Sequence, residues 1–354
     1  MTSPSRGEAH HPAPDPDGSS TLPRSRIQSA LLAWYRTSAR SLPWRETNDP
    51  YAIWVSEIML QQTRVATVIP YYEQFLEALP TIADLAAADA DLLRRLWRGL
   101  GYYRRVSLLQ RGAREVVEHH GGRLPGQYEQ LRKLSGLGPY TAGAVASIAF
   151  GQPVSAVDGN VIRVFSRWTN DDRPVEAIRK SLQSGWADAW VPLSDPGSWN
   201  QALMELGATL CTPRSPRCGE CPVQRWCGAW AAGTVDTLPV KARKVANIPA
   251  RVRALVYRRD DRVWLEKRPE EGLLAGLWGF PLEDADADTP GHAVLRYRHV
   301  FTHRTWHVAV HVVDGEPPAG SGRWTSVDNL AEEAIPTAFR PIVTWLTTRD
   351  LFSG

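Results

Sequence analysis

Apolar residues recur at helical spacing through the first part of the chain. Residues 51–65 read YAIWVSEIMLQQTRV, and apolar side chains cover much of the circumference of the helix that this spacing predicts. Asp49 and Pro50, directly before it, are typical of an N-cap and of a first helical position. A helix with so little polar surface is expected to be buried among other elements.

A tight turn between two helices is predicted in residues 130–150, which read QLRKLSGLGPYTAGAVASIAF. An apolar-periodic helix should stop at Ser135-Gly136, and Pro139 should open a second helix rich in small residues. Glycines such as Gly136 and Gly138 permit close backbone approach, and the amides that begin the second helix suit a phosphate. The alternative is an ordinary packing corner between two helices.

Strand-like segments replace helical spacing beyond Gly233. VRALVY and RVWLEK predict two strands around a turn at Asp260-Asp261, and a helix is predicted near the end of the chain, around residues 338–346. We therefore expect a mostly α domain followed by a smaller α+β domain. The predicted boundaries are 25–232 for the helical domain, 233–248 for a linker and 249–354 for the second domain.

Composition places most of the chain among globular proteins, since 43% of its residues are hydrophobic and 22% are charged. Residues 1–24 are the exception, with five prolines and no Ile, Val, Phe, Trp or Tyr, and are expected to be a disordered tail. They have no apolar stretch of the kind that a signal peptide needs, and no run of about 18 apolar residues occurs elsewhere. We expect a cytoplasmic protein, associated with the nucleoid if bacterial, and no contact with a membrane.

Positive charge is unevenly distributed, although a net charge of +3 is too small to indicate a nucleic-acid partner. Residues 92–114 contain no acid and hold Arg94, Arg95, Arg98, Arg104, Arg105, Arg111 and Arg114. Tyr102 and Tyr103 lie inside this run. Arginines beside aromatic rings suit phosphates and stacked bases, and the alternative is a solvated helix face.

All four cysteines of the chain lie within residues 211–227, which read CTPRSPRCGECPVQRWC. Six, two and five residues separate Cys211, Cys218, Cys221 and Cys227. Reduced thiols are expected inside a cell, so disulfides are disfavoured. Four thiolates suit a structural zinc ion or an iron–sulfur cluster equally well, and the spacing alone leaves both open. Either centre would fix a loop that carries Arg214, Arg217 and Arg225.

Two carboxylates stand out as candidates for catalysis. Glu57 lies among the apolar residues of the predicted helix 51–65, where desolvation would raise its pKa toward the range of a general acid. Pairing with Arg64 would give it a purely structural role instead. Asp158 follows a Gly/Pro loop in AVDGNV, where a turn or helix cap is the alternative.

Five motifs in this order resemble the MutY-type adenine DNA glycosylases of the helix-hairpin-helix glycosylase superfamily. The motifs are LPWR at 42–45, WVSEIMLQQT at 54–63, LSGLGPYTAGA at 134–144, AVDGNV at 156–161 and the four-cysteine set. The resemblance implies a two-lobed helical domain with a [4Fe-4S] cluster on Cys211, Cys218, Cys221 and Cys227. It implies a DNA repair enzyme, expected to act as a monomer, that flips adenine out of duplex DNA at A:8-oxoguanine or A:G mispairs.

The resemblance also implies roles for single residues. Glu57 would protonate the departing adenine at N7, Asp158 would stabilise the positive sugar, and Tyr140 and Asn160 would stand beside them. Contacts with the helix stack or with 8-oxoguanine are implied for Gln61, Gln62, Thr63 and Tyr102, and Gly136 and Gly138 would grip phosphate. Related endonuclease III enzymes carry a lysine nucleophile where this chain has Tyr140, so we expect a glycosylase with weak or no lyase activity.

The C-terminal part resembles the Nudix-like domain of the same family. After GLWGFPLE the sequence continues DADADTPGHA, without the Arg-Glu and Glu-Glu metal box of Nudix hydrolases, so we expect recognition without hydrolysis. Phe301, Thr302 and His303 match a Phe-Ser-His loop that contacts 8-oxoguanine in relatives.

Two other functions compete with this interpretation. An endonuclease III-like enzyme for oxidised pyrimidines is disfavoured by Tyr140. A non-catalytic iron–sulfur protein that binds DNA is disfavoured because Glu57 and Asp158 are both present.

Overall fold

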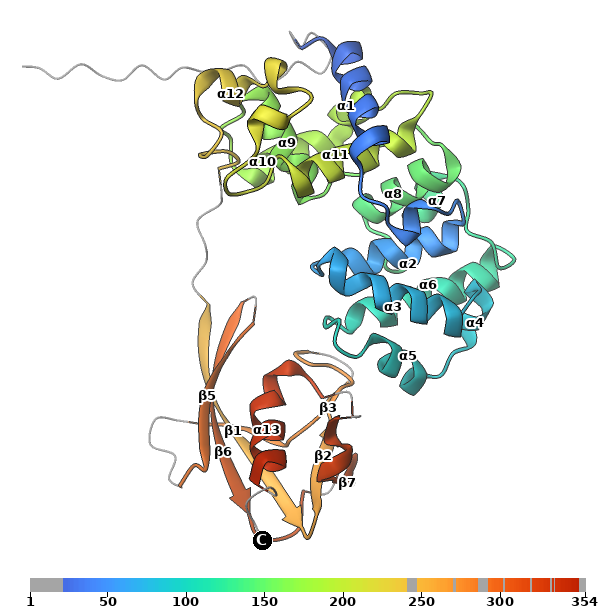
Figure 1. Cartoon of the computed structure of the whole chain (residues 1–354). Helices are drawn as coiled ribbons and strands as arrows, with labels where there is room; N and C mark the ends of the chain where they lie inside the picture. Colours follow the sequence, from blue (N-terminus) through green and yellow to red (C-terminus); the bar gives the residue numbers. More distant parts are fainter. Residues whose placement is uncertain are drawn as a thin grey trace, which may run out of the picture. The chain divides into compact units, whose positions relative to one another are not determined.

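The computed structural model describes residues 22–240, 247–269, 272–285, 292–301, 303–318, 320–331, 333 and 335–349. The chain divides into two compact units, one of residues up to 87 with 108–242 and the other of residues 88–107 with 243–354 (Figure 1). Most of the predicted tail lies outside the described residues, and the first helix begins at Arg24. None of the described helices is long and apolar enough to cross a bilayer.

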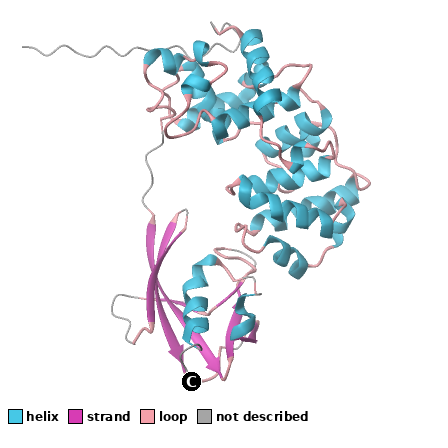
Figure 2. Ribbon diagram, viewed as in Figure 1, coloured by secondary structure: helices cyan, strands magenta, loops and turns pink. Residues whose placement is uncertain are grey.

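Helices dominate the chain as far as Ala232 (Figure 2). They are α1 Arg24–Ser38, α2 Pro50–Leu60, α3 Val65–Ala78, α4 Ile82–Ala87, α5 Ala90–Trp97, α6 Arg104–His119, α7 Tyr128–Leu131, α8 Pro139–Phe150, α9 Gly159–Thr169, α10 Val175–Ser181, α11 Pro196–Thr209 and α12 Gly228–Ala232. Short helical turns are η1 Pro43–Arg45, η2 Leu182–Trp186, η3 Asp188–Trp190, η4 Cys218–Glu220 and η5 Gln224–Trp226.

Helix α2 begins as predicted. The Asp49 side chain accepts a hydrogen bond from the Tyr51 N–H at 3.0 Å, and Pro50 is the first helical residue. Every residue from Tyr51 to Met59 is buried, which explains why apolar side chains surround this helix. Helix α8 packs against it and also runs close to a loop, because a Cβ at Gly143 would lie 2.2 Å from the Ser155 carbonyl oxygen.

The predicted turn before α8 is present, but the helix leading into it ends earlier than expected. Helix α7 stops at Leu131 rather than at Ser135-Gly136. After Arg132 the backbone bonds tighten to i−3, from Lys133 to Gln130 and from Leu134 to Leu131, and the Ser135 N–H then donates to Glu115 of α6 at 2.7 Å. Gly136 has φ +84°, and Pro139 opens α8 as predicted.

A second core joins α1, α9 and α11 to the cysteine loop. Phe165 and Trp168 pack against Trp190 and Trp199, and partly buried Cys211, Cys221 and Cys227 lie against the same cluster. The helical core therefore packs against the four-cysteine segment.

A mixed sheet with helices on one face forms the second part of the chain. Its elements are β1 Ile248–Arg259, β2 Arg262–Lys267, β3 Trp278–Gly279, β4 Leu282–Asp284, β5 Leu295–Val300, β6 Arg304–Val313, β7 Gly322–Ser326, η6 Val327–Ala331, η7 Thr337–Phe339 and α13 Arg340–Arg349. The order is β3-β2-β1-β6-β5, with β4 on β1 and β7 on β2. Strands β1 and β6 are parallel and the other pairs are antiparallel.

The predicted strand pair and terminal helix are confirmed. Strands β1 and β2 pair up to Arg259 and Arg262, and Asp260 in the turn between them has φ +53°. Val252, Val308 and Val310 of the sheet share a core with Ile342 and Leu346 of α13. A helical region followed by an α+β sheet domain is the fold class that the sequence predicts.

Candidate active site and cysteine loop

Glu57 points from α2 into the protein interior and is 5% exposed. The pKa of its carboxyl is raised to about 7: burial is the main cause of the rise, the charge of Asp158 adds to it, and the Tyr140 hydrogen bond and Arg45 oppose it. Tyr140 Oη donates to Glu57 Oε2 at 2.5 Å. Among the described contacts, Tyr140 rather than Arg64 is the partner of Glu57. A carboxyl with a pKa near neutrality holds a transferable proton at physiological pH.

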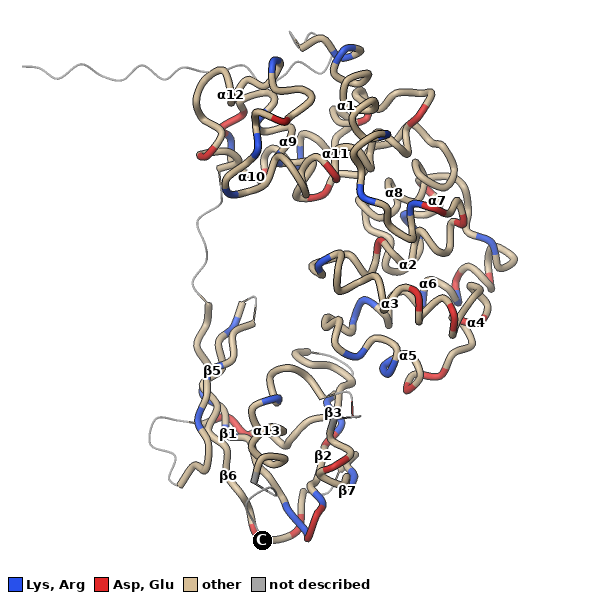
Figure 3. The backbone as a smooth tube through the Cα atoms, viewed as in Figure 1, with Lys and Arg blue, Asp and Glu red and all other residues tan. Residues whose placement is uncertain are grey.

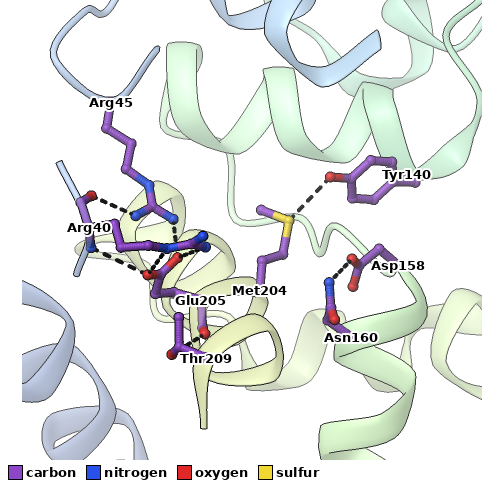
Figure 4. A network of polar contacts seen from close by, with 8 residues as sticks. All are labelled: Arg40, Arg45, Tyr140, Asp158, Asn160, Met204, Glu205 and Thr209. Carbon is purple, nitrogen blue, oxygen red and sulfur yellow. Dashed lines mark hydrogen bonds and ion pairs between the residues drawn. The ribbon is translucent and has the colours of Figure 1, made fainter. Parts of the chain in front are cut away.

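Tyr140 stands in the first turn of α8 and connects two helices through its hydroxyl. Burial and the Glu57 charge raise the pKa of Tyr140 well above its ordinary value, so the phenol stays protonated and acts as a donor. Its Oη also lies 3.2 Å from the Met204 sulfur on α11 (Figure 4). These contacts hold the ring, and through it the Glu57 carboxyl, in one orientation.

Asp158 is both a helix cap and a member of the site. Its Oδ1 accepts from the Val161 N–H at 2.7 Å, which caps α9, and its Oδ2 accepts from Asn160 Nδ2 at 2.7 Å. Burial raises the pKa of Asp158, and these hydrogen bonds oppose that rise. The helix-cap interpretation of Asp158 is confirmed, and its catalytic role stays a prediction.

Asn160 is oriented from its other side by Arg163. Arg163 Nη2 donates to Asn160 Oδ1 at 2.7 Å and to the Gly207 carbonyl at 2.7 Å, while its Nε donates to the Cys211 carbonyl at 2.7 Å. A Cβ at Gly207 would come within 2.5 Å of the Asn160 Cβ, so α9 and α11 touch here. A continuous polar path thus connects Asp158 to the backbone of the cysteine loop.

Sequence reasoning missed a buried ion-pair network beside the site. Glu205 of α11 is 1% exposed and accepts from Arg40 Nε and Nη2 at 2.7 Å each and from Arg45 Nη2 at 2.8 Å (Figure 4). Burial alone would raise the pKa of Glu205, but the two arginines outweigh it and lower the pKa. The signal was available, since LPWR ends in Arg45 and an acid in the apolar segment around Leu203 and Leu206 needs a partner.

The four cysteines surround one cavity. Cys211, Cys218, Cys221 and Cys227 line it together with apolar side chains such as Trp168 and Leu210. Burial raises the pKa of the Cys221 thiol to about 12, so this sulfur needs a metal centre to be held as a thiolate. An all-sulfur donor set in an apolar cavity fits a [4Fe-4S] cluster.

Arg167 ties the cysteine loop to α9 and is 1% exposed. Its Nη1 donates to Cys211 Sγ at 3.3 Å and to the Thr212 carbonyl at 2.8 Å. Its Nε donates to the carbonyls of Val235 and Leu238. One buried guanidinium therefore joins the start of the loop to the segment that follows α12.

The segment after α2 carries the predicted stack-contacting residues. Gln61 Nε2 donates to Thr141 Oγ1 at 3.2 Å, and the Thr63 hydroxyl donates to the Gln61 carbonyl at 3.4 Å. Gln62 is exposed with φ +58°. Such a backbone conformation is costly for a non-glycine residue and is typical of functional sites.

Tyr102, like Gln62, is an exposed residue with a positive φ. It is 54% exposed, its φ is +50°, and the Arg105 guanidinium lies 5.6 Å from its ring centre. An exposed ring suits stacking on a base, and the contact of Tyr102 with the helix stack or with 8-oxoguanine stays a prediction.

Several arginines of the run 92–114 have structural roles that the sequence did not indicate. Arg105 is buried and donates to the carbonyls of Leu100 and Gly101. Arg94 pairs with Asp91, and Arg114 Nε donates to the Ala86 carbonyl at 3.0 Å. The interpretation of all seven as one phosphate-binding surface is therefore too broad.

The loop predicted to contact 8-oxoguanine is the tight turn between β5 and β6. The Phe301 N–H donates to the Arg304 carbonyl at 2.7 Å, and the Phe301 ring packs on Trp306 with 4.9 Å between ring centres. His303 is exposed, and Thr302 lies outside the described residues. Phe301 therefore has a packing role in this hairpin, and a contact of Phe301 or His303 with a base stays a prediction.

Comparisons with protein families match three parts of the chain. Residues 55–188 match the HhH-GPD superfamily of base excision DNA repair proteins, 211–227 match the iron-sulfur binding domain of endonuclease III, and 252–345 match the NUDIX domain. The first range holds Glu57, Tyr140, Asp158 and Asn160, and the second spans the four cysteines.

Known proteins resemble the chain over most of its length. An adenine DNA glycosylase of Rattus norvegicus is 37% identical, over 88% of this chain and 76% of the relative. The Homo sapiens adenine DNA glycosylase is 40% identical over 72% of this chain and 57% of its own length. Among solved structures, a thermostable thymine-DNA glycosylase matches 59% of this chain and 97% of its own, with 29% identity and a TM-score of 0.54.

Proposed function

The chain belongs to the adenine DNA glycosylase family, and from that premise we propose which of its residues release the base and which mispair they serve. It is an N-glycosylase of base excision repair that acts on adenine mispairs in DNA. Its target is adenine opposite 8-oxoguanine, and opposite guanine to a lesser degree. When bound, the [4Fe-4S] cluster joins the four thiolates and thereby fixes the loop 211–227.

Glu57 acts as the general acid. Its buried carboxyl, with a pKa of about 7, is the single observation that carries the proposal. In the flipped-out complex it donates its proton to N7 of adenine, so that the base departs as a neutral molecule. Tyr140 orients the carboxyl through the 2.5 Å hydrogen bond.

Asp158 acts as the negative partner of the sugar. As the bond to adenine breaks, positive charge develops on the deoxyribose, and a buried carboxylate stabilises it more strongly than water would. The Asn160 amide, held at 2.7 Å, keeps that carboxylate in place. The two carboxyl groups thus have opposite protonation states and separate roles.

The reaction ends at base release without backbone cleavage. Tyr140 stands where related lyases carry a lysine, and a phenol that stays protonated cannot form a Schiff base. Lys133 and Lys180, the lysines between residues 25 and 232, are both exposed on the surface. Neither reaches the buried carboxyl groups.

The test uses duplexes that differ only at the target pair: A:8-oxoguanine, A:G, A:T and thymine glycol:A. We expect free adenine from the first two, fastest opposite 8-oxoguanine, and strand cleavage only after alkali. Release of thymine glycol with alkali-independent cleavage would instead indicate an endonuclease III-like enzyme.

A substitution at Glu57 tests its role. Glu57→Gln keeps the shape and can still accept the Tyr140 hydrogen bond, but it has no carboxyl proton to give, so single-turnover adenine release should fall at least about 100-fold while mispair affinity stays near wild type. Turnover at close to the wild-type rate would make Glu57 a structural residue.

A further inference from the structure

Strand register places a group of cations on the face of the C-terminal sheet that α13 does not cover. Across β5, β6 and β1, Arg298 is opposite His307 and His307 is opposite Arg251. In the next row on the same face, Arg296 is opposite Ala309, which is opposite Arg253. We call Arg251, Arg253, Arg296, Arg298 and His307 the basic face.

The alternation of each strand separates this face from the core. Val252, Val308 and Tyr297 pack with α13, and side chains one residue along a strand point to the opposite side. Arg251, Arg296, Arg298 and His307 are accordingly exposed. Figure 3 shows Lys and Arg positions gathered along β5 and the strands beside it.

The basic face is dense in charge, and among the described residues few carboxylates neutralise it. Neighbouring strands are about 4.8 Å apart and alternate residues about 6.7 Å apart, so the four arginines and His307 occupy an area on the order of 10 by 7 Å. Within the described residues, Glu283 pairs with Arg253 at 3.4 Å, and no carboxylate pairs with Arg251, Arg296 or Arg298.

Two further observations concern Arg253 and His311, which lie on this side of the sheet. The Arg253 Nε is buried without a hydrogen-bond partner among the described residues. His311, on the same side of β6, has its pKa lowered by burial and then by Arg253 and Arg296. The positive charge of this face therefore acts on a side chain below the surface, where Glu283 opposes it.

We propose that the basic face binds the phosphate backbone of duplex DNA, as a second electrostatic contact outside the site that releases adenine. Guanidinium groups bind phosphate oxygens with two parallel hydrogen bonds, and repeated rows of them suit a repeating anion better than a single small one. DNA is the substrate of the family, so the proposal rests on that function. Contacts of this kind carry no base specificity.

The experiment compares two double variants of the full-length protein. Arg251→Gln with Arg298→Gln removes two charges from the basic face. Arg258→Gln with Arg262→Gln removes two exposed charges from the β1–β2 turn of the same domain and serves as the control. Anisotropy measures affinity for an undamaged and an A:8-oxoguanine duplex at several KCl concentrations, and thermal melting checks folding.

The binding constant falls as salt rises, and each lost phosphate contact makes the slope of log K against log salt less steep by about 0.9. The slope of the basic-face variant should therefore be less steep than that of the wild type by about 1.8 on both duplexes. Adenine release at saturating enzyme should be unchanged. A wild-type slope, or an equal loss in the control, overturns the proposal. A wild-type slope combined with lost binding of polyglutamate would assign the face to an acidic protein and also overturn it. Because the slope is measured on undamaged DNA, it remains informative even if no adenine is released.

Discussion

At the scale of single residues, the site works by giving two carboxyl groups different surroundings. Glu57 receives one hydrogen bond, from Tyr140, in a buried position, while Asp158 accepts from both Val161 and Asn160. Both pKa values are raised by burial, but only Asp158 has several donors that favour the charged form. Their surroundings therefore favour a protonated Glu57 and an ionised Asp158.

These surroundings predict the pH dependence of the reaction. Glu57 must be protonated, so kcat/KM should fall as the pH rises through about 7. Asp158 must be ionised, and its raised pKa places the acid limb above the ordinary range of an aspartate. A bell-shaped profile of kcat/KM should result.

Tyr140→Phe provides the control for this assignment. The Tyr140 hydrogen bond lowers the pKa of Glu57, so its removal should move the alkaline limb to higher pH. An alkaline limb that stays in place would mean that another group controls it.

At the scale of elements, the turn before α8 is held by a neighbouring helix. Glu115 of α6 accepts from the Ser135 N–H at 2.7 Å and from its hydroxyl, and Arg111 Nε donates to Ser135 Oγ at 2.6 Å. Gly136 has φ +84°, and a Cβ there would lie 3.3 Å from Leu108. The geometry of the proposed phosphate grip thus depends on α6.

We expect Glu115→Ala to weaken DNA binding by about three- to thirtyfold and to destabilise the fold by about 1–3 kcal/mol, because it leaves the Ser135 N–H without its partner. Both are measured on one protein, by anisotropy and by urea unfolding. Glu118→Ala, an exposed acid on the same helix, is the matched control and should leave both unchanged. Wild-type affinity in Glu115→Ala would show that the turn keeps its shape unaided.

The cysteine loop also depends on one buried side chain of a neighbouring helix. The purified protein should be brown and contain about four irons per chain. Arg167→Lys removes the forked contacts to Cys211, Thr212, Val235 and Leu238, since an ammonium cannot reproduce them.

Iron content and visible absorbance should therefore decline faster in Arg167→Lys on exposure to a chelator. Arg179→Lys, at a half-buried position where the guanidinium pairs with Glu176 at 3.3 Å, should behave as wild type. Colourless and active zinc-loaded protein would refute the cluster assignment.

At the scale of the whole molecule, chemistry and lesion recognition are assigned to different parts of the chain. Glu57, Tyr140, Asp158 and the cysteine loop all belong to the helical unit. His303 is exposed on the turn between β5 and β6. We infer that the sheet domain reads the base opposite adenine.

Truncation after Val240, which keeps the Val235 and Leu238 carbonyls that Arg167 contacts, should leave an active glycosylase. Its preference for 8-oxoguanine over guanine should be reduced about ten- to a hundredfold, as the loss of about two hydrogen bonds allows. Single-turnover rates on both mispairs measure this ratio, with circular dichroism to confirm folding. His303→Ala in the full-length chain should reproduce part of the loss. An unchanged ratio would assign recognition to residues such as Gln62 and Tyr102.

Local chemistry in the sequence determined the features that depend on neighbours along the chain. Asp49 and Pro50 start α2, Pro139 starts α8, and the strands meet at Asp260, because caps and turns satisfy backbone groups within a few residues. Glu57 could be singled out because a lone acid in an apolar helix is costly. The motifs and the cysteine spacing were sufficient to predict the family and, through it, the cluster.

Only the tertiary structure decided the partners. Tyr140 reaches Glu57 from 83 residues away, and Arg40 reaches Glu205 from 165 residues away. Charge alone did not distinguish a buried Arg105 from an arginine available to phosphate, nor did helical spacing show that Ser135 leaves its helix for Glu115. Such pairings depend on how distant elements pack, because burial makes an unpaired polar group costly and packing determines which partner is within reach.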